Sequence, residues 1–296
     1  MPSAFSLPSF AKVNLQLRIL GKRDDGFHEL CTVFQTVSLH DTIHFAESDT
    51  LELSCDDPNV PTDERNLIIK TAKALQKITG TNKGAAIHLE KRIPSPGGLG
   101  GGSSNAAMAI LGLTKIWEVW PPDVELSELT TSLGSDVGFF LTGGTAIGTG
   151  RGEKIGPLDD VTEDYILVVT PDVHVSTWEA FERIGAATLT KETRERILRV
   201  CRLEAESLDL RSSVLINDFE ASVFDAHPEI MRVKETLLEL GAVNAAMSGS
   251  GASVFAIFDK TETRQAAIKA LDFESTWRKF AVATVSRSKY REMLHL

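Results

Sequence analysis

The chain has 296 residues, of which 42% are hydrophobic, so it is long enough to form one large or two medium domains with buried cores. Its 41 acidic residues against 31 basic ones give a net charge of -10, which argues against a broad basic surface for nucleic acid or an anionic membrane. Because residues 1–12 lack the pattern of a secretory leader and no apolar run has the length of a membrane span, we expect an unprocessed cytoplasmic protein.

The first predicted element is a strand over residues 11–19, in which apolar and polar side chains alternate. The alternation places Lys12 and Asn14 on one face of the strand. An edge strand with a solvated polar face explains this pattern as well as a functional lysine does. The strand by itself therefore leaves both interpretations open.

A turn predicted at residues 21–26 leads into a second alternating strand and exposes Phe27 and His28. Further along, His40 and His44 are four residues apart, a spacing that on a helix would place both on one zinc ion. The apolar residues around them alternate as in strands on either side of a turn. We therefore expect a hairpin with solvated histidines in preference to a metal site.

The three cysteines, Cys31, Cys55 and Cys201, are far apart, and none belongs to a C-x-x-C pair. An odd number of separated cysteines is typical of reduced thiols in a cytosol and not of a disulfide framework. We therefore expect these residues to serve in packing.

A glycine-rich segment between a strand predicted at 86–90 and the helical residues 106–113 is the most informative part of the chain. The segment consists of Pro94, Ser95, Pro96, Gly97, Gly98, Leu99, Gly100, Gly101, Gly102, Ser103, Ser104 and Asn105. Glycines let the backbone approach an oxyanion closely, and the N–H groups at the start of a helix attract negative charge. The segment therefore predicts a cradle for a polyphosphate such as ATP, with Ser103 or Ser104 as the helix N-cap.

Other interpretations of this segment are weaker. A flexible linker has a similar composition, but it would not lie between a strand and a helix. No lysine follows the last glycine as in G-x-x-x-x-G-K-[ST], and no G-x-G-x-x-G frame fits. Neither of the two commonest nucleotide folds is therefore favoured.

Helices are predicted over residues 66–76 and 126–133, and Asp136 follows the second of them. Asp136 opens the apolar stretch 137–141, where Ser135 or Asp136 would serve as a simple N-cap. A carboxylate beside buried aromatic side chains also stands where electrostatics become useful for chemistry. The sequence leaves both roles open.

The second half of the chain follows a glycine-rich, charged stretch at 150–164, and we predict domains at 1–155 and 156–296. A second glycine loop, which is either a hairpin turn or part of a site, contains Ser248, Gly249, Ser250 and Gly251. The other predicted elements are a strand at 165–169, a capping box at 176–179, helices near 218–226 and 228–240, and strands at 254–258 and 280–286. Strands and helices mix without regular βαβ alternation, so we predict an α+β fold.

Three separated motifs together resemble the GHMP kinase superfamily, namely Ser9–Leu15, Gly97–Asn105 and Ser248–Ala252. Three further segments look most like the branch of that superfamily that acts on 4-diphosphocytidyl-2-C-methyl-D-erythritol, namely Gly26–Leu30, Asn66–Ile68 and Leu133–Val137. The resemblance implies a two-domain fold with the active site in the cleft between the domains. It also implies phosphorylation of the acceptor's 2-hydroxyl by ATP with Mg²⁺.

The resemblance assigns a role to each matching residue. Lys12 and Asp136 would be catalytic, with Asp136 as the acid-base residue and Lys12 beside the reacting hydroxyl. Asn66 and the loop from Pro94 to Ser104 would bind ATP. The acceptor would be held by Asn14, Phe27, His28, Leu215, Ser248, Gly249, Ser250 and Gly251. Phe27 would stack on the cytosine and His28 would bind it through the backbone, while the Mg²⁺ ligands stay unknown beyond a guess at the Ser104 hydroxyl.

Two positions depart from the family's pattern. Pro96 stands where the loop more often has glycine, and Leu215 stands where some members place a second aromatic residue against cytosine. Two other functions stay open. A related kinase for homoserine or phosphomevalonate would not use the turn with Phe27 and His28, and a non-catalytic ATP sensor would need neither Lys12 nor Asp136.

Overall fold

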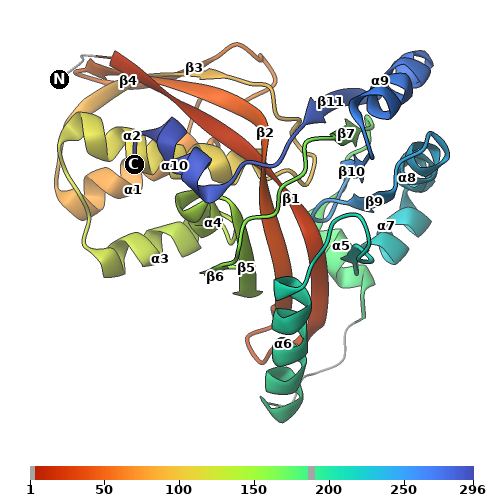
Figure 1. The fold of residues 1–296 in the computed structure, drawn as a ribbon. Helices are drawn as coiled ribbons and strands as arrows, with labels where there is room; N and C mark the ends of the chain where they lie inside the picture. Colours follow the sequence, from red (N-terminus) through yellow and green to blue (C-terminus); the bar gives the residue numbers. More distant parts are fainter. Residues whose placement is uncertain (1–3, 186–190) are drawn as a thin grey trace.

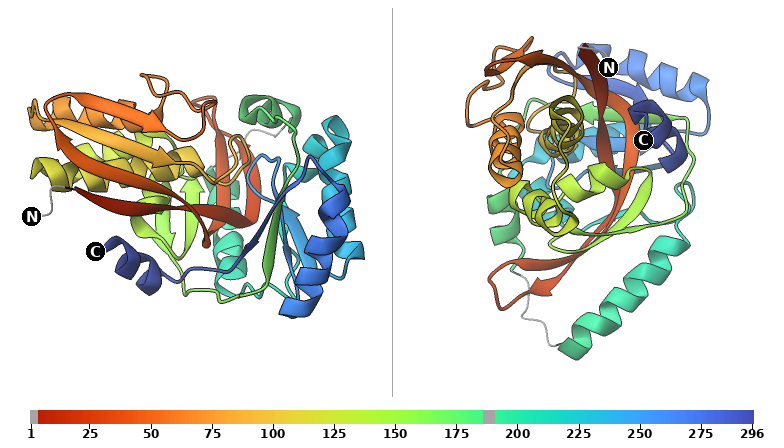
Figure 2. Two further views of the ribbon diagram at one scale, coloured as in Figure 1. Left: turned by 90° about the horizontal axis from the view of Figure 1, so that it is seen from above. Right: turned by 90° about the vertical axis from the view of Figure 1, so that its left-hand side faces the viewer.

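The computed structural model describes residues 4–185 and 191–296, which fold into two lobes (Figure 1, Figure 2). Each lobe is built on one β-sheet with helices packed against it. Antiparallel strand pairs and helices mix without repeated βαβ units, which confirms the α+β prediction. None of the described helices combines the length and the apolar character needed to cross a bilayer.

The sheet of the first lobe has seven strands among the described residues, and its main path runs β3-β4-β2-β1-β8. The remaining pairings join β5 to β2 and β6 to β5. The strands are β1 (Ala4–Lys22), β2 (His28–Ser48), β3 (Leu51–Cys55), β4 (Gly84–Glu90), β5 (Thr145–Gly150), β6 (Lys154–Pro157) and β8 (Ile216–Asn217). The helices of this lobe are α1 (Leu67–Thr79), α2 (Gly101–Trp117), α3 (Asp123–Leu133) and α4 (Val137–Thr142).

The sheet of the second lobe has four described strands in the order β11-β7-β10-β9, and every neighbouring pair is antiparallel. The strands are β7 (Ile166–Thr170), β9 (Asn244–Met247), β10 (Val254–Ile257) and β11 (Arg278–Val282). The helices that follow β7 along the chain are α5 (Thr177–Arg183), α6 (Lys191–Glu206), α7 (Glu220–Ala226), α8 (Pro228–Glu239), α9 (Thr261–Ala270), the 3-10 turn η1 (Leu271–Phe273) and α10 (Arg287–Leu294).

Strand β1 lies inside the first sheet, between β2 and β8. Lys12 and Asn14 are only 3% and 2% exposed, so the interpretation of β1 as an edge strand with a solvated polar face is wrong. The two glycine loops pack on this face, since a Cβ on Gly100 would lie 3.1 Å from Cγ of Lys12 and one on Gly249 would lie 3.4 Å from its Nζ. β8, from the second half of the chain, pairs with β1 only at Gln16 and Leu17. A local sequence pattern cannot show such a distant partner.

Strand β2 continues through both His40 and His44, so the hairpin predicted at these histidines is also wrong. A bulge causes the broken alternation, because Phe10 pairs with His40 whereas the next residue, Ala11, pairs with Val37. The His44 ring bonds to a serine and a glutamate on the neighbouring strands. Among the described residues, no group of three or more side chains is arranged to hold a metal ion.

The helix starts follow local capping rules. The Asn66 side chain accepts a hydrogen bond from the N–H of Ile68 at 2.9 Å and begins α1. Ser176 accepts from the N–H of Glu179 at 3.4 Å at the start of α5, as the predicted capping box requires. Pro228 occupies the first turn of α8, where its missing N–H costs nothing.

The second glycine loop lies between β9 and β10, which confirms the hairpin interpretation of its topology. Asn217, on β8, ties this loop to the first sheet. Its Nδ2 donates to the carbonyl oxygens of Met247 at 2.7 Å and Gly249 at 2.8 Å, while the residue itself pairs with Leu17 of β1. The loop of the second lobe is therefore held against β1 of the first lobe.

Helix α10, near the end of the chain, packs back on the first lobe (Figure 1). The fully buried hydroxyl of Tyr290 donates to the carbonyl oxygen of Phe140 at 2.5 Å. The predicted boundary between 1–155 and 156–296 stays a prediction, since β8 follows β7 along the chain and still belongs to the first sheet.

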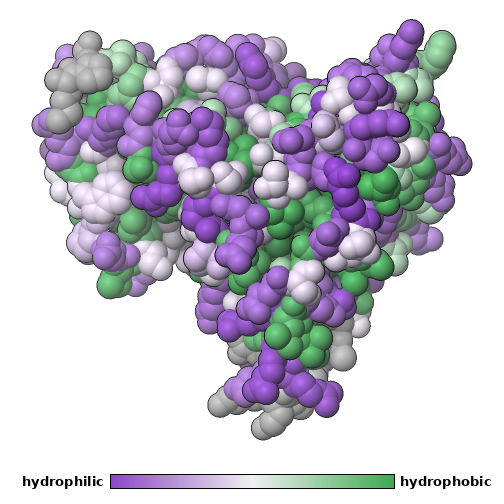
Figure 3. All heavy atoms as spheres, in the orientation of Figure 1, coloured by the Kyte–Doolittle hydropathy of each residue, from purple (hydrophilic) through white to green (hydrophobic). Residues whose placement is uncertain are grey.

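Helix α6 stands out from the body of the molecule as an arm beside the far ends of β1 and β2 (Figure 1, Figure 2). The arm shows hydrophobic atoms among polar ones (Figure 3), and Val200 and Leu203 of α6 are 49% and 61% exposed. On its inner face, Cys201 is buried in the same hydrophobic cluster as Cys31. These two cysteines and the half-buried Cys55 are free thiols, as expected.

Candidate active site

A cavity of about 290 Å³ lies between the two lobes. Its walls come from β1, β2, the loop before α2, the start of α4 and the loop between β9 and β10. The predicted residues that line it are Lys12, Asn14, Gly98, Gly100, Ser103, Asp136, Gly249 and Ser250. The fold therefore brings the three sequence motifs together, as expected for a site in a cleft.

Lys12 is the centre of a buried polar network. Its Nζ lies 3.5 Å from Oδ2 of Asp136 and donates to Oδ1 of Asn14 at 2.5 Å. Asn14 in turn donates to the hydroxyl of Thr32 at 2.7 Å, and that hydroxyl donates to the carbonyl oxygen of Gln16. Burial lowers the pKa of Lys12, whereas the charge of Asp136 acts in the opposite direction. These contacts hold the ammonium group in one place beside the carboxylate.

Asp136 stands at the start of α4, but its side chain makes no capping hydrogen bond. The alternative role of a simple N-cap is therefore wrong. The side chain is 26% exposed and borders the cavity, and the hydroxyl of Ser135 donates to it at 3.4 Å. Phe139 and Phe140 are fully buried directly after it and anchor the short helix. The buried rings hold the helix that carries Asp136, and the carboxylate of Asp136 is accessible from the cavity.

The two glycine loops touch each other. Ser248 Oγ donates to the carbonyl oxygen of Gly98 at 3.0 Å, and the N–H of Ser253 donates to that of Gly97 at 3.2 Å. Gly98 has a φ of +71°, and a Cβ at this position would come within 2.1 Å of the Ser248 carbonyl oxygen. The first loop therefore packs against the other lobe, so the interpretation of it as a flexible linker is wrong.

Helix α2 begins at Gly101 with Gly100 as its N-cap, so the prediction that Ser103 or Ser104 caps it is wrong. Gly100 takes the left-handed conformation that leads the chain into the helix. Ser103 lines the cavity, while Ser104 is fully buried and its hydroxyl is hydrogen-bonded to that of Ser9 at 2.8 Å. The first N–H groups of a helix have no partner within it, so this end of α2 offers donors and a positive dipole to an anion.

A larger hollow of about 960 Å³ shares part of its wall with this cavity. Phe27 and His28 line it, and the His28 ring stacks on Phe181 with the centroids 5.1 Å apart. Burial, and to a lesser extent Lys22, lowers the pKa of His28, which favours the neutral ring. Arg151 borders both hollows, and its Cζ lies 4.7 Å from the centroid of the Phe27 ring. A cation therefore stands where the two hollows meet.

Arg151, Phe181 and Phe219 are among the residues of the smaller cavity's wall that the sequence did not predict. The rings of Phe181 and Phe219 meet edge to face with centroids 4.8 Å apart. An arginine in a stretch taken as a domain boundary carries no local signal of its role. A phenylalanine on a short helix is likewise indistinguishable in sequence from a core residue.

Leu215 does not reach either hollow, so the structure does not support the predicted role of this residue beside the cytosine. It is 5% exposed and packs in the hydrophobic cluster that contains Cys201 of α6. Leu99 is also buried, and its carbonyl oxygen accepts a hydrogen bond from the N–H of Lys12 at 3.0 Å. Leu99 therefore fixes the loop on β1 through its backbone.

Other residues predicted to bind ATP lie around the loop without lining the cavity. The Asn66 side chain caps α1. A Cβ on Gly102 would lie 3.4 Å from the side chain of Leu67, so the start of α1 lies beside the start of α2. Residues 94–96 line a separate hollow together with residues 170–174. Whether these positions contact ATP stays a prediction.

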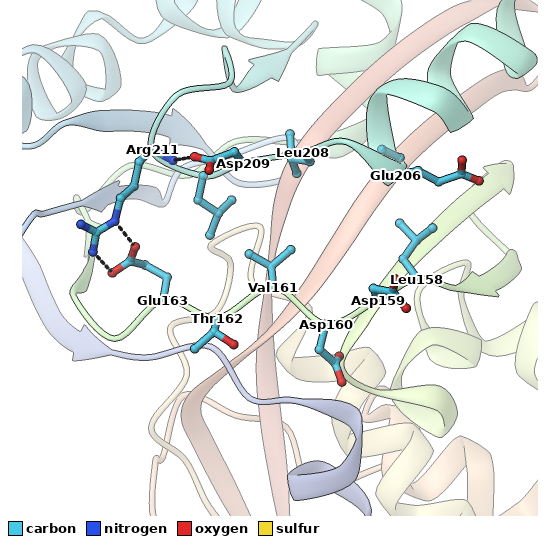
Figure 4. A pocket seen from close by; sticks show the side chains of 12 residues that line it. Leu158, Asp159, Asp160, Val161, Thr162, Glu163, Glu206, Leu208, Asp209 and Arg211 are labelled. Carbon is cyan, nitrogen blue, oxygen red and sulfur yellow. Dashed lines mark hydrogen bonds and ion pairs between the residues drawn. The ribbon is translucent and has the colours of Figure 1, made fainter.

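A further hollow, of about 350 Å³, is lined by residues 158–163 and 205–211 and contains none of the predicted site residues. Arg211 points at Glu163 there and contacts both of its carboxylate oxygens (Figure 4). Arg211 therefore neutralises Glu163, the most buried acidic side chain of this hollow. The hollow lacks the combination of a lysine, a carboxylate and a helix start that the cavity at Lys12 has.

Two family models match the chain: GHMP kinases N terminal domain over residues 66–144 and GHMP kinases C terminal over residues 187–275. The chain is 40% identical over 272 residues to the 4-diphosphocytidyl-2-C-methyl-D-erythritol kinase of Chlorobium phaeobacteroides, with 90% of each chain covered. It is 38% identical over 291 residues to the protein of the same name from Solibacter usitatus, with 97% of this chain and 90% of that one covered.

Solved structures agree with these relatives. The structure is similar to the crystal structure of a 4-(cytidine 5'-diphospho)-2C-methyl-D-erythritol kinase, with 31% identity, a TM-score of 0.75, and 95% of this chain and 99% of that chain covered. A homoserine kinase from Cytophaga hutchinsonii, with 19% identity and a TM-score of 0.67 over 97% of this chain and 96% of its own, has the same fold.

Proposed function

The chain belongs to the GHMP kinase family and within it to the 4-diphosphocytidyl-2-C-methyl-D-erythritol kinases, and on that premise we propose that it phosphorylates the 2-hydroxyl of this acceptor with ATP. The acceptor oxygen forms a bond to the γ-phosphorus, and the bond from that phosphorus to the β–γ bridging oxygen breaks. The products are the 2-phosphate, ADP and a proton. A kinase of this type serves the non-mevalonate route to isoprenoid precursors.

The contact between Lys12 and Asp136 is the observation that carries the proposed mechanism. We assign to Asp136 the acceptance of the hydroxyl proton, and to Lys12 the orientation of the carboxylate and the neutralisation of charge that builds up on the phosphoryl oxygens. A carboxylate is a weak base towards an alcohol, so the proton leaves late. Phosphoryl transfer tolerates this order because its transition state is loose and depends on positioning and charge neutralisation.

The glycine loop and the start of α2 are assigned to the phosphates of ATP. The N–H groups of the first turn supply donors, and Ser103 and Gly100 border the cavity where the γ-phosphate would lie. The residues at the cavity also fit Mg²⁺, which, when bound, would neutralise the phosphate charge.

Ser103 and Asp136 offer one hydroxyl and one carboxylate at the cavity, which suits an ion that keeps several of its waters. Ser104 does not offer its hydroxyl there, because it is fully buried and hydrogen-bonded to Ser9.

The larger hollow is assigned to the cytidyl part of the acceptor. Phe27 is 52% exposed at its wall, so the part of the ring that Arg151 does not cover is accessible to a base. His28 and Phe181 form a second aromatic surface in the same hollow. Arg151 stands between this hollow and the catalytic cavity, so its guanidinium is placed for a diphosphate that links a base in one to a polyol in the other.

Release of ADP from ATP and Mg²⁺ with different acceptors tests the proposal. Activity with 4-diphosphocytidyl-2-C-methyl-D-erythritol, and none with homoserine, phosphomevalonate or no acceptor, is the expected result. Activity with one of the other acceptors would show that the pocket is assigned wrongly. ATP binding without any turnover would favour a sensor over an enzyme.

We also propose a cytoplasmic location. The support for it is that all three cysteines of the chain are free thiols, which is the usual state in a reducing compartment. Fractionation of cells that produce the protein would test this location directly.

A further inference from the structure

Asp41 and Lys91 form a buried ion pair behind the glycine loop, outside the groups assigned to the reaction. Lys91 Nζ lies 2.8 Å from Oδ2 and 3.1 Å from Oδ1 of Asp41. The two side chains are 0% and 7% exposed, respectively. Removing two charges from water opposes their attraction, so a buried pair is weak evidence for stability and its place in the fold needs another explanation.

The pair holds the backbone at the point where β4 ends and the glycine loop begins. Oδ1 of Asp41 accepts the N–H of Arg92 at 2.7 Å and the N–H of Ile93 at 2.8 Å. The ammonium group of Lys91 also donates to the carbonyl oxygen of Ile93. One carboxylate and one ammonium group therefore satisfy three backbone polar groups of Arg92 and Ile93 and set the direction in which the chain leaves the strand.

The same segment lies against the first residue of α2. A Cβ on Gly101 would meet Cγ2 of Ile93 at 3.1 Å and Nζ of Lys91 at 3.4 Å. Any shift of Ile93 would therefore move the start of the helix whose N–H groups face the cavity. Because Asp41 neutralises Lys91, the pair acts on the phosphate site mainly through position and little through charge.

The neighbouring strand completes this support. Ser9 of β1 is the register partner of Asp41 on β2, and its hydroxyl donates to Oδ1 of Asn105 in α2 at 2.7 Å. Ser9 is fully buried. Two adjacent positions of the central strands thus hold the beginning of the loop and the first turns of the helix that follows it.

We propose that Asp41 and Lys91 are positioning residues for ATP, which keep the loop from Ile93 to Gly100 and the start of α2 at the distance from Lys12 that the phosphates require. The inference rests on the proposed binding of ATP by this loop and goes beyond it by naming what holds the loop in place. A misplacement of about 1 Å lowers an enzymatic rate about 10²-fold. Loss of the pair is therefore expected to impair the use of ATP and not the binding of the acceptor.

Two double variants separate position from charge. D41L/K91M removes both charges and the acceptor of the two N–H groups, whereas D41N/K91M removes both charges and keeps an oxygen in the same place. We expect D41L/K91M to raise the KM and the dissociation constant for ATP about tenfold or more, with the acceptor KM unchanged. D41N/K91M is expected to restore the ATP constants to values near those of the wild type.

Glu163 and Arg211 provide a matched control. Glu163 is 4% exposed, pairs with Arg211 at 2.8 Å and accepts the N–H of Tyr165, but it lies outside both hollows of the site. E163L/R211M is expected to lower thermal stability and to leave the ATP constants unchanged. If D41L/K91M behaves in the same way as this control, the positioning role is wrong.

ATP binding is measured by calorimetry with ADP and a non-hydrolysable ATP analogue, so the result does not depend on the acceptor. A wild-type chain that binds ATP but does not phosphorylate the cytidyl acceptor would overturn the proposed function alone. A wild-type chain that binds no nucleotide would overturn both. If D41L/K91M does not fold, the test uses Asp41→Asn alone and D41N/K91M. The inference requires that the single variant weakens ATP binding and that the added Lys91→Met restores it. Failure of that rescue would overturn the inference.

Discussion

Ser248 and Gly98 are in contact although they are 150 residues apart, because Ser248 Oγ donates to the carbonyl oxygen of Gly98 at 3.0 Å. The carbonyl oxygen of Ser248 also fills the space in which a side chain on Gly98 would begin. The loop assigned to ATP is therefore shaped in part by the lobe that does not carry it. Changes at this contact are expected to alter ATP binding as well as stability.

Gly98→Ala tests the contact. Gly98 has a φ of +71° and no room for a Cβ, so the substitution is expected to destabilise the protein by more than about 1 kcal/mol and to weaken ATP binding. Gly80→Ala is the control, because Gly80 has the same φ of +71° at the end of α1 with no atom within 4 Å of a Cβ. Thermal unfolding and calorimetry measure both. Equal effects at the two positions would show that the loop contact contributes nothing.

Asp136→Asn is expected to lower turnover about 10²- to 10⁴-fold, because the amide cannot take the proton of the acceptor hydroxyl. ATP binding is expected to stay close to that of the wild type, since the N–H groups of α2 are unchanged. ADP release and nucleotide calorimetry measure the two properties. Asp123→Asn, at an exposed carboxylate in the first turn of α3, serves as control. Unchanged turnover would remove Asp136 from the chemistry.

Lys12→Met is expected to lower turnover about 10²- to 10³-fold and yet to raise the melting temperature at pH 7. Burial lowers the pKa of Lys12 in the folded protein, so the protonated side chain is less favourable there than in the unfolded chain. This penalty is fully present below the folded pKa and disappears as the pH rises towards the unfolded value of 10.5. The gain in melting temperature is therefore expected to shrink as the pH is raised from 7 to 10.

Thermal unfolding over this pH range measures the effect, and the exposed residue Lys70 provides the control. Lys70→Met is expected to change neither turnover nor the pH dependence of stability. A Lys12→Met protein that is less stable than the wild type at pH 7, or equally stable at every pH, would contradict the assigned effect of burial.

Phe27→Ala is expected to weaken acceptor binding by about 1 to 3 kcal/mol, by analogy with the stacking of bases on aromatic side chains. ATP binding is expected to stay unchanged, because Phe27 lines the larger hollow and not the glycine loop. Phe273→Ala, at a side chain that is 94% exposed, is the control. An unchanged acceptor dissociation constant would place the cytosine elsewhere.

Arg151→Gln is expected to raise the acceptor KM about tenfold, since it removes the cation between the two hollows. The effect is expected to be smaller at high ionic strength, where salt screens charges that are partly exposed. Steady-state kinetics at two salt concentrations measure it, with Arg65→Gln at a side chain that is 78% exposed as control. A change in the ATP KM alone would assign Arg151 to the nucleotide instead.

The sequence predicted many elements because their signals are local. The alternation in β1, the capping box of α5 and the strand–loop–helix order around the glycine segment all depend on residues within a few positions of each other. The helix start at Gly101 was predicted wrongly at Ser103 or Ser104, because a glycine in the left-handed conformation caps the helix without a side chain. The turn at His40 was wrong because a bulge imitates a break in alternation.

The acceptor pocket was harder to predict. Phe27 was assigned through the family resemblance, beside a turn that was predicted to expose it, whereas Phe181 looks like any core residue of a short helix. Leu215 was assigned by position alone, and the structure buries it in the core. Side chains that meet only after distant elements pack leave no signal in the spacing of residues.

By itself the sequence determined which chemical groups this protein has for its site, namely Lys12, Asp136 and two glycine loops. The reactivity of a side chain and the backbone freedom of a glycine are properties of single residues. The tertiary structure decided what these groups can do. The glycine loops of the two lobes close around Lys12, whose burial lowers its pKa. Arg151 lies on the wall that both hollows share. Burial and proximity depend on which distant segments meet, and the free energy that brings them together belongs to the whole fold.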